Sequence, residues 1–300
     1  MTTGSSVYPT SEAVLSSVRA PVHASDLAQE ACAALMVRPD QFDVAYSINP
    51  WMTMHHPVDR DRARTQWNHL YTKLVGLGVQ LHVIDPGPGL YDMVFAANAG
   101  MIHRGRAVVS RFRYAQRQQE TDYFWQWFCH QELEVCQLPS GCFWEGQACC
   151  TFVDGYLLCS LGERANAQAY KALASIWGIP ERRLYYLPIK DSRFYHLDIA
   201  LCMLDRETCL VYPQAFPFED YRWLQAHVRR TIPVDLADAL CFACNAFVVD
   251  HTVVLNVGIS ERLEQRLFAA GYETAKLDAS EFHKSGGGIK CLAFRYQPGE

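Results

Sequence analysis

The apolar residues of this chain fall into helix-type and strand-type patterns that alternate along its length. Spacings of three and four, as in Trp67, Leu70, Tyr71 and Leu74, place apolar side chains on one face of a helix. Segments with this pattern predict helices at residues 59–77, 118–132, 163–177, 218–228 and 260–270. Five helices are therefore expected, distributed evenly along the chain.

Strand-type segments rich in branched and aromatic residues lie between these helices. Hairpin-like strand pairs are expected before the helices, for example at residues 93–97 with 107–112 and at residues 197–204 with 208–212. A short apolar strand is expected after each helix, at residues 79–84, 134–138, 184–189, 232–234 and 273–277. The repeating unit is thus hairpin, helix and strand, which predicts an α/β protein.

Polar or reactive residues recur at a nearly constant step. The intervals are 49, 47, 51, 49 and 46 residues, and they separate Asn49, Asn98, Glu145, His196, Asn245 and Cys291. A period of about 20–50 residues is typical of stacked or radial arrays, in which no unit buries its apolar face alone. A radial array of five units would bring these residues to one central axis.

The continuous repetition favours one domain over residues 33–300, in which no Pro/Gly/Ser-rich linker occurs. Half of the 300 residues are hydrophobic, which is ample for a core. Residues 1–32 lack the charged start and apolar centre of a signal peptide. We expect them to form a mobile or loosely packed N-terminal extension.

The net charge of −5 gives no electrostatic reason to expect a nucleic-acid or anionic-membrane partner. The chain has no apolar run of about 18 residues, so no membrane span is expected. Its twelve cysteines could indicate a disulfide framework, but such frameworks belong to small secreted chains, so we expect reduced thiols and a cytoplasmic location. Cys241 and Cys244 form one CxxC with only His251 nearby, which predicts no zinc site.

The last repeat carries three glycines directly before a cysteine. Gly286, Gly287 and Gly288 permit a tight backbone path that could expose the Cys291 thiol at the tip of an apolar strand. An ordinary turn leading to a core cysteine fits the same motif. A phosphate-binding loop does not fit, because no GK[ST] follows the glycines.

A thiol nucleophile needs a base and an orienting group from elsewhere in the chain. His196 and Asp198 lie two apart on a predicted strand, where both side chains would face the same way. A pair of surface residues fits this spacing equally well. Glu145 stands between Trp144 and Gly146, an unusual place for a solvated carboxylate, although an exposed strand-end glutamate also fits.

These motifs, FxEG at Glu145, HLD from His196 to Asp198 and GGGxxC ending at Cys291, resemble in order and spacing the guanidino-group-modifying superfamily. It includes arginine deiminases, dimethylarginine dimethylaminohydrolases, amidinotransferases and arginine dihydrolases. The resemblance covers about residues 33–300. It implies a pentein, a five-bladed α/β propeller with pseudo-five-fold symmetry and its active site on the axis, working without metal or cofactor.

The resemblance also implies roles for single residues. Cys291 would be the nucleophile and His196 the general acid and base. Glu145 and Asp198 would hold the substrate guanidinium, with Glu145 also pairing with His196. The implied partner is a small molecule, arginine or a related guanidino compound, and a homo-oligomer is compatible with the family.

The segments around Asn49 and Asn98 resemble the arginine dihydrolase branch most. In that branch Arg117 would bind the substrate carboxylate and Asn49 would contact the substrate. Deiminases usually have aspartate in place of Asn98. An amide can both donate to and accept from the neutral ureido group of citrulline, so Asn98 favours its retention and a second hydrolysis to ornithine, ammonia and carbon dioxide.

One position departs from the family, which commonly continues its glutamate motif as EGxGD. Here Cys149 stands where the aspartate is usual. This departure leaves room for weakened activity, an altered substrate or an inactive protein that binds a guanidino ligand. The resemblance predicts an arginine dihydrolase first, and it also leaves open an arginine deiminase, a dimethylarginine dimethylaminohydrolase or an amidinotransferase.

Overall fold

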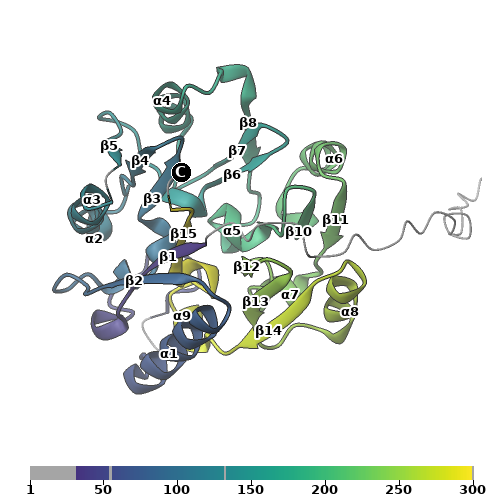
Figure 1. Cartoon of the computed structure of the whole chain (residues 1–300), viewed down its shortest axis with the longest axis horizontal. Helices are drawn as coiled ribbons and strands as arrows, with labels where there is room; N and C mark the ends of the chain where they lie inside the picture. The colour runs from purple at the N-terminus through teal and green to yellow at the C-terminus, as the bar shows by residue number, and fades with distance from the viewer. Residues whose placement is uncertain (1–31, 54–55, 132, 299–300) are drawn as a thin grey trace, which may run out of the picture. The chain divides into compact units, whose positions relative to one another are not determined.

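Three-stranded sheets, each with one main helix, are the repeating unit of this protein. The structure, a computed structural model, describes residues 32–53, 56–131 and 133–298 (Figure 1). In each sheet the first strand pairs antiparallel with the second, a helix follows, and the third strand pairs parallel with the second. A parallel return needs a crossover connection, which the helix provides. We call one sheet with its helix a blade.

Four blades follow one another along the chain. Their elements are, in order, β3 (Gly100–His103), β4 (Arg106–Val109), α3 (Glu120–Cys129) and β5 (Glu134–Cys136); β6 (Cys150–Val153), β7 (Tyr156–Leu161), α4 (Ala167–Trp177) and β8 (Leu184–Pro188); β9 (Leu201–Met203), β10 (Thr208–Val211), α6 (Phe218–His227) and β11 (Arg230–Pro233); and β12 (Phe247–Val249), β13 (Thr252–Asn256), α8 (Glu261–Ala269) and β14 (Glu273–Leu277).

The fifth blade joins the two ends of the described chain. Its first strand is β15 (Ala293–Tyr296), and the second and third are β1 (Ala33–Val37) and β2 (Gln80–Ile84), which flank α1 (Arg60–Gly76). The register places Ala33 opposite Tyr296. Figure 1 shows the five blades around a common centre. The predicted five-bladed α/β propeller is therefore confirmed.

The five predicted helices are present, with ends that differ by a few residues from the prediction. Asp59, Asn166 and Ser260 cap three of them, because each side chain accepts a hydrogen bond from the backbone N–H three residues later. The apolar face of α1, including Trp67 and Leu70, is buried in the core of the fifth blade. The helical period of the sequence thus identified both the helices and their buried sides.

The segments before the first strands differ from the prediction. Residues 93–97 are not a strand: two 3-10 helices, η2 (Tyr91–Val94) and η3 (Ala96–Asn98), flank Phe95 there. A helical turn, α5 (Leu197–Ala200), occupies the start of the predicted strand at 197–204. Similar turns, η4 (Gly146–Ala148) and η8 (Lys290–Leu292), precede β6 and β15. A helical turn pairs backbone groups within its own segment, as in the 3.0 Å bond from Asn98 N–H to Phe95 O, so no partner strand is needed where five blades converge.

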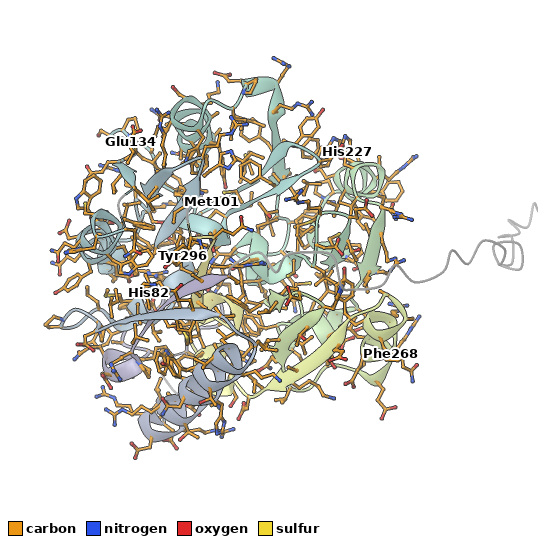
Figure 2. The ribbon with its side chains drawn as sticks, viewed as in Figure 1. His82, Met101, Glu134, His227, Phe268 and Tyr296 are labelled. Atoms are coloured by element: carbon orange, nitrogen blue, oxygen red, sulfur yellow. The ribbon has the colours of Figure 1, made fainter. Side chains whose placement is uncertain are left out.

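The remaining short helices are α2 (Ala115–Gln118), α7 (Leu236–Leu240), α9 (Ser280–His283), η1 (Pro39–Gln41), η5 (Glu181–Arg183), η6 (Ser192–Phe194) and η7 (Pro213–Ala215). Large exposed apolar side chains are few, and Phe268 at the end of α8 is an example (Figure 2). None of the helices in the described ranges is long and apolar enough to cross a membrane. Residues 31–300 form one compact unit. The extension predicted for residues 1–32 lies almost wholly outside the described residues and stays a prediction.

Candidate active site

Each blade contributes one polar or reactive residue to the centre of the propeller. These residues lie at or beside the turn that precedes the first strand of their blade, and all are buried: Asn98, Glu145, His196, Asn245 and Cys291. They bond to one another across blades. Asn98 Nδ2 donates to Glu145 O at 3.3 Å, and Asn245 Nδ2 lies 3.1 Å from Cys291 Sγ. The predicted convergence of the repeat on one axis is therefore confirmed for these five.

Asn49 does not belong to this set, although it fits the sequence period. It lies in the loop between β1 and α1, after a second strand rather than before a first strand. Its Nδ2 donates to Ser285 O at 3.0 Å and its Oδ1 accepts from Trp51 N–H at 2.9 Å. Asn49 thus reaches the centre from the side, and its spacing to Asn98 does not reflect structural equivalence.

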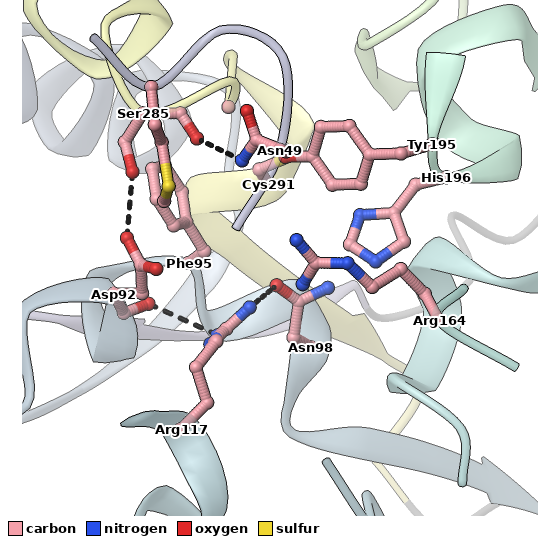
Figure 3. A pocket seen from close by; sticks show the side chains of 12 residues that line it. Asn49, Asp92, Phe95, Asn98, Arg117, Arg164, Tyr195, His196, Ser285 and Cys291 are labelled. Carbon is pink, nitrogen blue, oxygen red and sulfur yellow. Dashed lines mark hydrogen bonds between the residues drawn. The ribbon is translucent and has the colours of Figure 1, made fainter. Parts of the chain in front are cut away.

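A small pocket opens at this centre, with a cavity volume of about 10 Å³, roughly the space of one water molecule (Figure 3). That volume is far below the roughly 300–1,000 Å³ of typical ligand pockets, so lining side chains must shift to admit an arginine-sized ligand. Five of the seven predicted site residues line it, namely Asn49, Asn98, Arg117, His196 and Cys291. The other two do not line it but contact residues that do: Glu145 bonds to Arg164 and His196, and Asp198 Oδ2 lies 4.0 Å from Cys291 Sγ.

Three glycines place Cys291 at this pocket. Gly286 has a left-handed backbone with φ 83°, and a Cβ on Gly287 would lie 2.1 Å from the Phe95 ring. The loop can therefore pass beneath Phe95 only with glycine there. Burial raises the pKa of the Cys291 thiol to about 12, and Asp198 Oδ2, 4.0 Å from Sγ, adds to this effect.

His196 and Glu145 form the second feature of the site. His196 Nε2 lies 2.9 Å from Glu145 Oε2. Burial favours a higher pKa for Glu145, but Arg164, His196 and Arg117 together lower it to about 2. Burial also lowers the pKa of His196 and outweighs the opposite effect of Glu145. An ionised carboxylate can only accept, so the proton lies on Nε2, and Nδ1 is a base with no hydrogen-bond partner among the described residues.

The predicted strand at His196 is wrong, and so is the reason given for its shared face with Asp198. His196 is the extended residue before α5, and Asp198 is the second residue of that helix. Their side chains diverge, since Asp198 Oδ2 pairs with Lys290 Nζ at 3.1 Å and lies on the Cys291 side. Asp198 Oδ1 is buried and bonds to no group in the described part of the chain. It is a free acceptor near the thiol.

Two buried arginines complete the charge pattern. Arg117 bonds both oxygens of Glu120, at 2.8 and 2.7 Å, and its Nη1 donates to Asn98 Oδ1 at 3.0 Å. Arg164 bonds both oxygens of Glu145, at 3.1 and 3.0 Å. Both guanidinium groups line the pocket. Glu145 is therefore engaged by protein cations in this structure, so a substrate guanidinium would have to compete for it.

Arg164 was not predicted as a site residue, although it fits the repeat. Arg117 lies 19 residues after Asn98, and Arg164 lies 19 residues after Glu145. Applying the period to arginine would have found it. Asp92 was also missed. It is a buried, pocket-lining carboxylate that accepts from Ser285 Oγ at 2.8 Å and Tyr46 Oη at 3.0 Å, and its burial raises its pKa.

Cys149, at the position where the family usually has aspartate, does not line the pocket. Its side chain is fully buried in an apolar cluster with Trp144 and Tyr170, and its Sγ lies 3.8 Å from Arg164 O. Burial raises its pKa well above the usual value for a thiol. Cys149 therefore packs as a small apolar residue beneath the Arg164 segment. None of the twelve cysteines forms a disulfide.

Several known proteins are similar to this chain in sequence. A family model described as N,N dimethylarginine dimethylhydrolase, eukaryotic, matches residues 43–296. The N(G),N(G)-dimethylarginine dimethylaminohydrolase of Mycobacterium tuberculosis is 37% identical over 88% of this chain and 85% of its own length. The bifunctional arginine dihydrolase/ornithine cyclodeaminase AgrE of Nostoc sp. is 36% identical over 87% of this chain, which spans only 37% of that longer protein.

Solved structures of related proteins have the same fold. The substrate-bound N-terminal domain of ArgZ, an arginine dihydrolase from the ornithine-ammonia cycle in cyanobacteria, superposes with a TM-score of 0.83 at 32% identity and covers 88% of this chain and 97% of that domain. The chain therefore belongs to the dimethylarginine dimethylhydrolase family, within the guanidino-group-modifying superfamily that its motifs resemble.

Proposed function

We propose that this protein hydrolyses the guanidino group of arginine through a covalent adduct on Cys291, and that it acts as an arginine dihydrolase. One observation carries the proposal. Cys291, with its thiol, and His196, with an unprotonated Nδ1, line the same buried pocket. Two carboxylates lie next to them: Asp198, which has one oxygen without a partner among the described residues, and Glu145, which is bonded to His196. Relatives named dimethylarginine dimethylaminohydrolase and arginine dihydrolase support guanidino chemistry.

The charges of the pocket suit the α-amino acid end of arginine. Arg117 and Arg164 offer guanidinium groups that can bind a carboxylate, and guanidinium is suited to bidentate carboxylate contacts. Asp92 is the one carboxylate among the lining residues and can accept from an α-ammonium group. Asn49 lies on the same side as Ser285, to which it is bonded. This arrangement directs the other end of the substrate towards Cys291.

The reaction begins when the substrate guanidinium enters beside Asp198 Oδ1, the carboxylate oxygen without a partner in the described part of the chain. A cation next to Cys291 lowers the pKa of a thiol that burial and Asp198 otherwise raise to about 12. The thiol passes its proton to His196 Nδ1, which becomes an imidazolium, and the thiolate attacks the guanidino carbon. The tetrahedral adduct then expels ammonia, which receives its proton from this imidazolium. The planar thiouronium remains on sulfur.

Water resolves this adduct. His196 Nδ1 accepts a proton from the water, whose oxygen attacks the thiouronium carbon, and the Cys291 thiolate leaves. The Nε2 bond to Glu145 holds the ring in place and stabilises the imidazolium that forms. The product is citrulline. If citrulline is retained, a second attack releases ammonia again and leaves a thiocarbamate, and its hydrolysis gives ornithine and carbon dioxide.

Retention of citrulline rests on Asn98 in this proposal. Its Oδ1 accepts from Arg117, and its Nδ2 makes one 3.3 Å bond to Glu145 O, which leaves the second amide proton to donate to a ureido oxygen. Aspartate has no such donor. The amide therefore favours a neutral ligand that a carboxylate would not.

Asn98→Asp is expected to shift the product of arginine hydrolysis from ornithine to citrulline and to make added citrulline a poor substrate. Arg117 Nη1, 3.0 Å from Oδ1, can pair with the new carboxylate, so folding should survive. Losing one hydrogen bond to a neutral ligand costs about 1 kcal/mol or more, a several-fold loss at least. Products from each substrate are quantified for wild type and variant. A wild type that ends at citrulline would show a deiminase and refute this role of Asn98.

A second candidate, dimethylarginine dimethylaminohydrolase, is favoured by the family model and by the relative from Mycobacterium tuberculosis. The same chemistry would then expel dimethylamine and stop at citrulline. Incubation with arginine and with dimethylarginine separately decides between the two. Ornithine from arginine supports the proposal, dimethylamine supports the second candidate, and binding of both ligands without product would show an inactive guanidino-binding protein. Self-association and a cytoplasmic location stay predictions.

A further inference from the structure

Asn245 is the one residue of the central set that the proposed reaction does not use. It lies in the turn between α7 and β12, and its side chain is fully buried. Two bonds connect it to the nucleophile and a third to the residue before it. Its Oδ1 accepts from Cys291 N–H at 3.1 Å, its Nδ2 lies 3.1 Å from Cys291 Sγ, and its backbone oxygen accepts from Lys290 N–H at 3.2 Å.

The orientation of the Asn245 amide is determined by backbone groups. Cys291 N–H is a donor and must face the amide oxygen, whereas Asp198 O, 3.3 Å from Nδ2, is an acceptor and must face the amide nitrogen. A flipped amide would lose both bonds. The group that faces the Cys291 sulfur is therefore an N–H donor.

The turn that presents Asn245 is held in a strained conformation. Phe242 is a bulky, fully buried residue with φ 59°, and its carbonyl accepts from Asn245 N–H at 2.9 Å. The Phe242 ring stacks on His283 at 4.4 Å and lies 4.6 Å from the Trp51 ring. Left-handed backbone at a bulky residue persists only where the surroundings enforce it, and it is concentrated at functional sites.

We propose that Asn245 anchors the nucleophile, because its amide N–H holds Cys291 Sγ in place and stabilises the thiolate. The inference rests on the proposed role of Cys291. Around the sulfur, Asp198 opposes ionisation, Lys290 is paired with Asp198, and Tyr195 and His196 complete the polar wall. A neutral donor suits this place, since it stabilises an anion without repelling a cationic substrate.

Asn245→Asp tests the inference without any substrate. The variant is isosteric and keeps the oxygen that accepts from Cys291 N–H, but it turns an acceptor towards the sulfur. Alkylation of Cys291 by neutral iodoacetamide at about pH 8 should slow about three- to tenfold, because a thiol pKa higher by one to two units leaves less thiolate, partly offset by its greater nucleophilicity. Peptide mass spectrometry separates the Cys291 label from those on the other cysteines. Asn245→Ala removes the donor without adding charge and provides the test if the aspartate variant does not fold.

Asn256→Asp is the matched control. Asn256 is also buried in this blade, and its Nδ2 donates to Cys241 O at 3.3 Å and Val257 O at 2.9 Å, away from the pocket. We expect Cys291 in Asn256→Asp to be alkylated at the wild-type rate. Wild-type labelling in the Asn245 variants, or equal slowing in Asn256→Asp, would overturn the inference. If the wild-type protein hydrolyses no arginine but Cys291 is labelled more slowly in Asn245→Asp than in the wild type, the inference is upheld and the proposed function is refuted.

Discussion

Cys291→Ser is expected to lower kcat for arginine by about four orders of magnitude or more while arginine still binds. A serine hydroxyl ionises far less readily than a thiol and is a far weaker nucleophile than a thiolate, so the covalent step fails. The pocket charges that bind arginine, Arg117, Arg164 and Asp92, are untouched. Single-turnover kinetics measures the loss, and calorimetric titration measures the affinity, which should stay within a few-fold of wild type.

Cys150→Ser is the matched control for this change. Cys150 and Cys291 are both 2% exposed, but Cys150 lies on β6 and does not line the pocket. Its replacement tests whether a buried serine by itself damages the protein. Equal losses in the two variants, or substantial turnover in Cys291→Ser, would be incompatible with Cys291 as the nucleophile.

Glu145→Gln is expected to lower kcat by about 10²- to 10⁴-fold and the free energy of unfolding by about 3–5 kcal/mol. The carboxylate bonds Arg164 through both oxygens and also accepts from His196 Nε2. A neutral amide leaves a buried guanidinium unpaired, and whichever way it is turned, its NH₂ faces a donor. If that donor is His196, the proton moves to Nδ1 and the base is lost. Chemical denaturation and steady-state kinetics measure the two effects.

Glu120→Gln separates these effects. Glu120 is as buried as Glu145 and accepts from Nε and Nη2 of Arg117, but it does not bond to His196. Stability should fall comparably, whereas the kinetic loss should appear mainly in KM through Arg117. Wild-type kcat in Glu145→Gln would remove Glu145 from the mechanism.

Glu145 also makes the stability of the folded protein depend on pH. Because the pKa of Glu145 is lowered to about 2, its stabilisation is present above about pH 4.5 and is lost as the pH falls towards 2.

The sequence period predicted the blades because every blade buries the apolar face of one helix against one sheet. Apolar residues at helical spacing must face a sheet, and this requirement located α1, α4 and α8 within a few residues. The strand prediction failed at residues 93–97 and 197–200, where the backbone turns at the crowded centre of the propeller. Propensity favours strands there, but convergence of five segments imposes helical turns.

The site could be predicted only where a motif or the period marks a residue. Cys291, His196 and Glu145 have recognisable neighbours. Arg164 is marked only by its 19-residue distance from Glu145, which equals that of Arg117 from Asn98. Asp92 is marked by neither, because a lone charged residue in sequence gives no sign that it will be buried and paired. Asn49 shows the opposite failure, since its spacing matched the period although it enters the pocket from a different part of its blade.

Trapping the covalent adduct decides whether Cys291 is the nucleophile of this protein. Wild-type protein is mixed with isotopically labelled arginine, quenched in acid during turnover, digested and analysed by mass spectrometry. We expect a labelled peptide that contains Cys291, heavier by one arginine less one ammonia. Product formation without that adduct, or an adduct on another cysteine such as Cys149 or Cys150, would show that Cys291 is not the nucleophile.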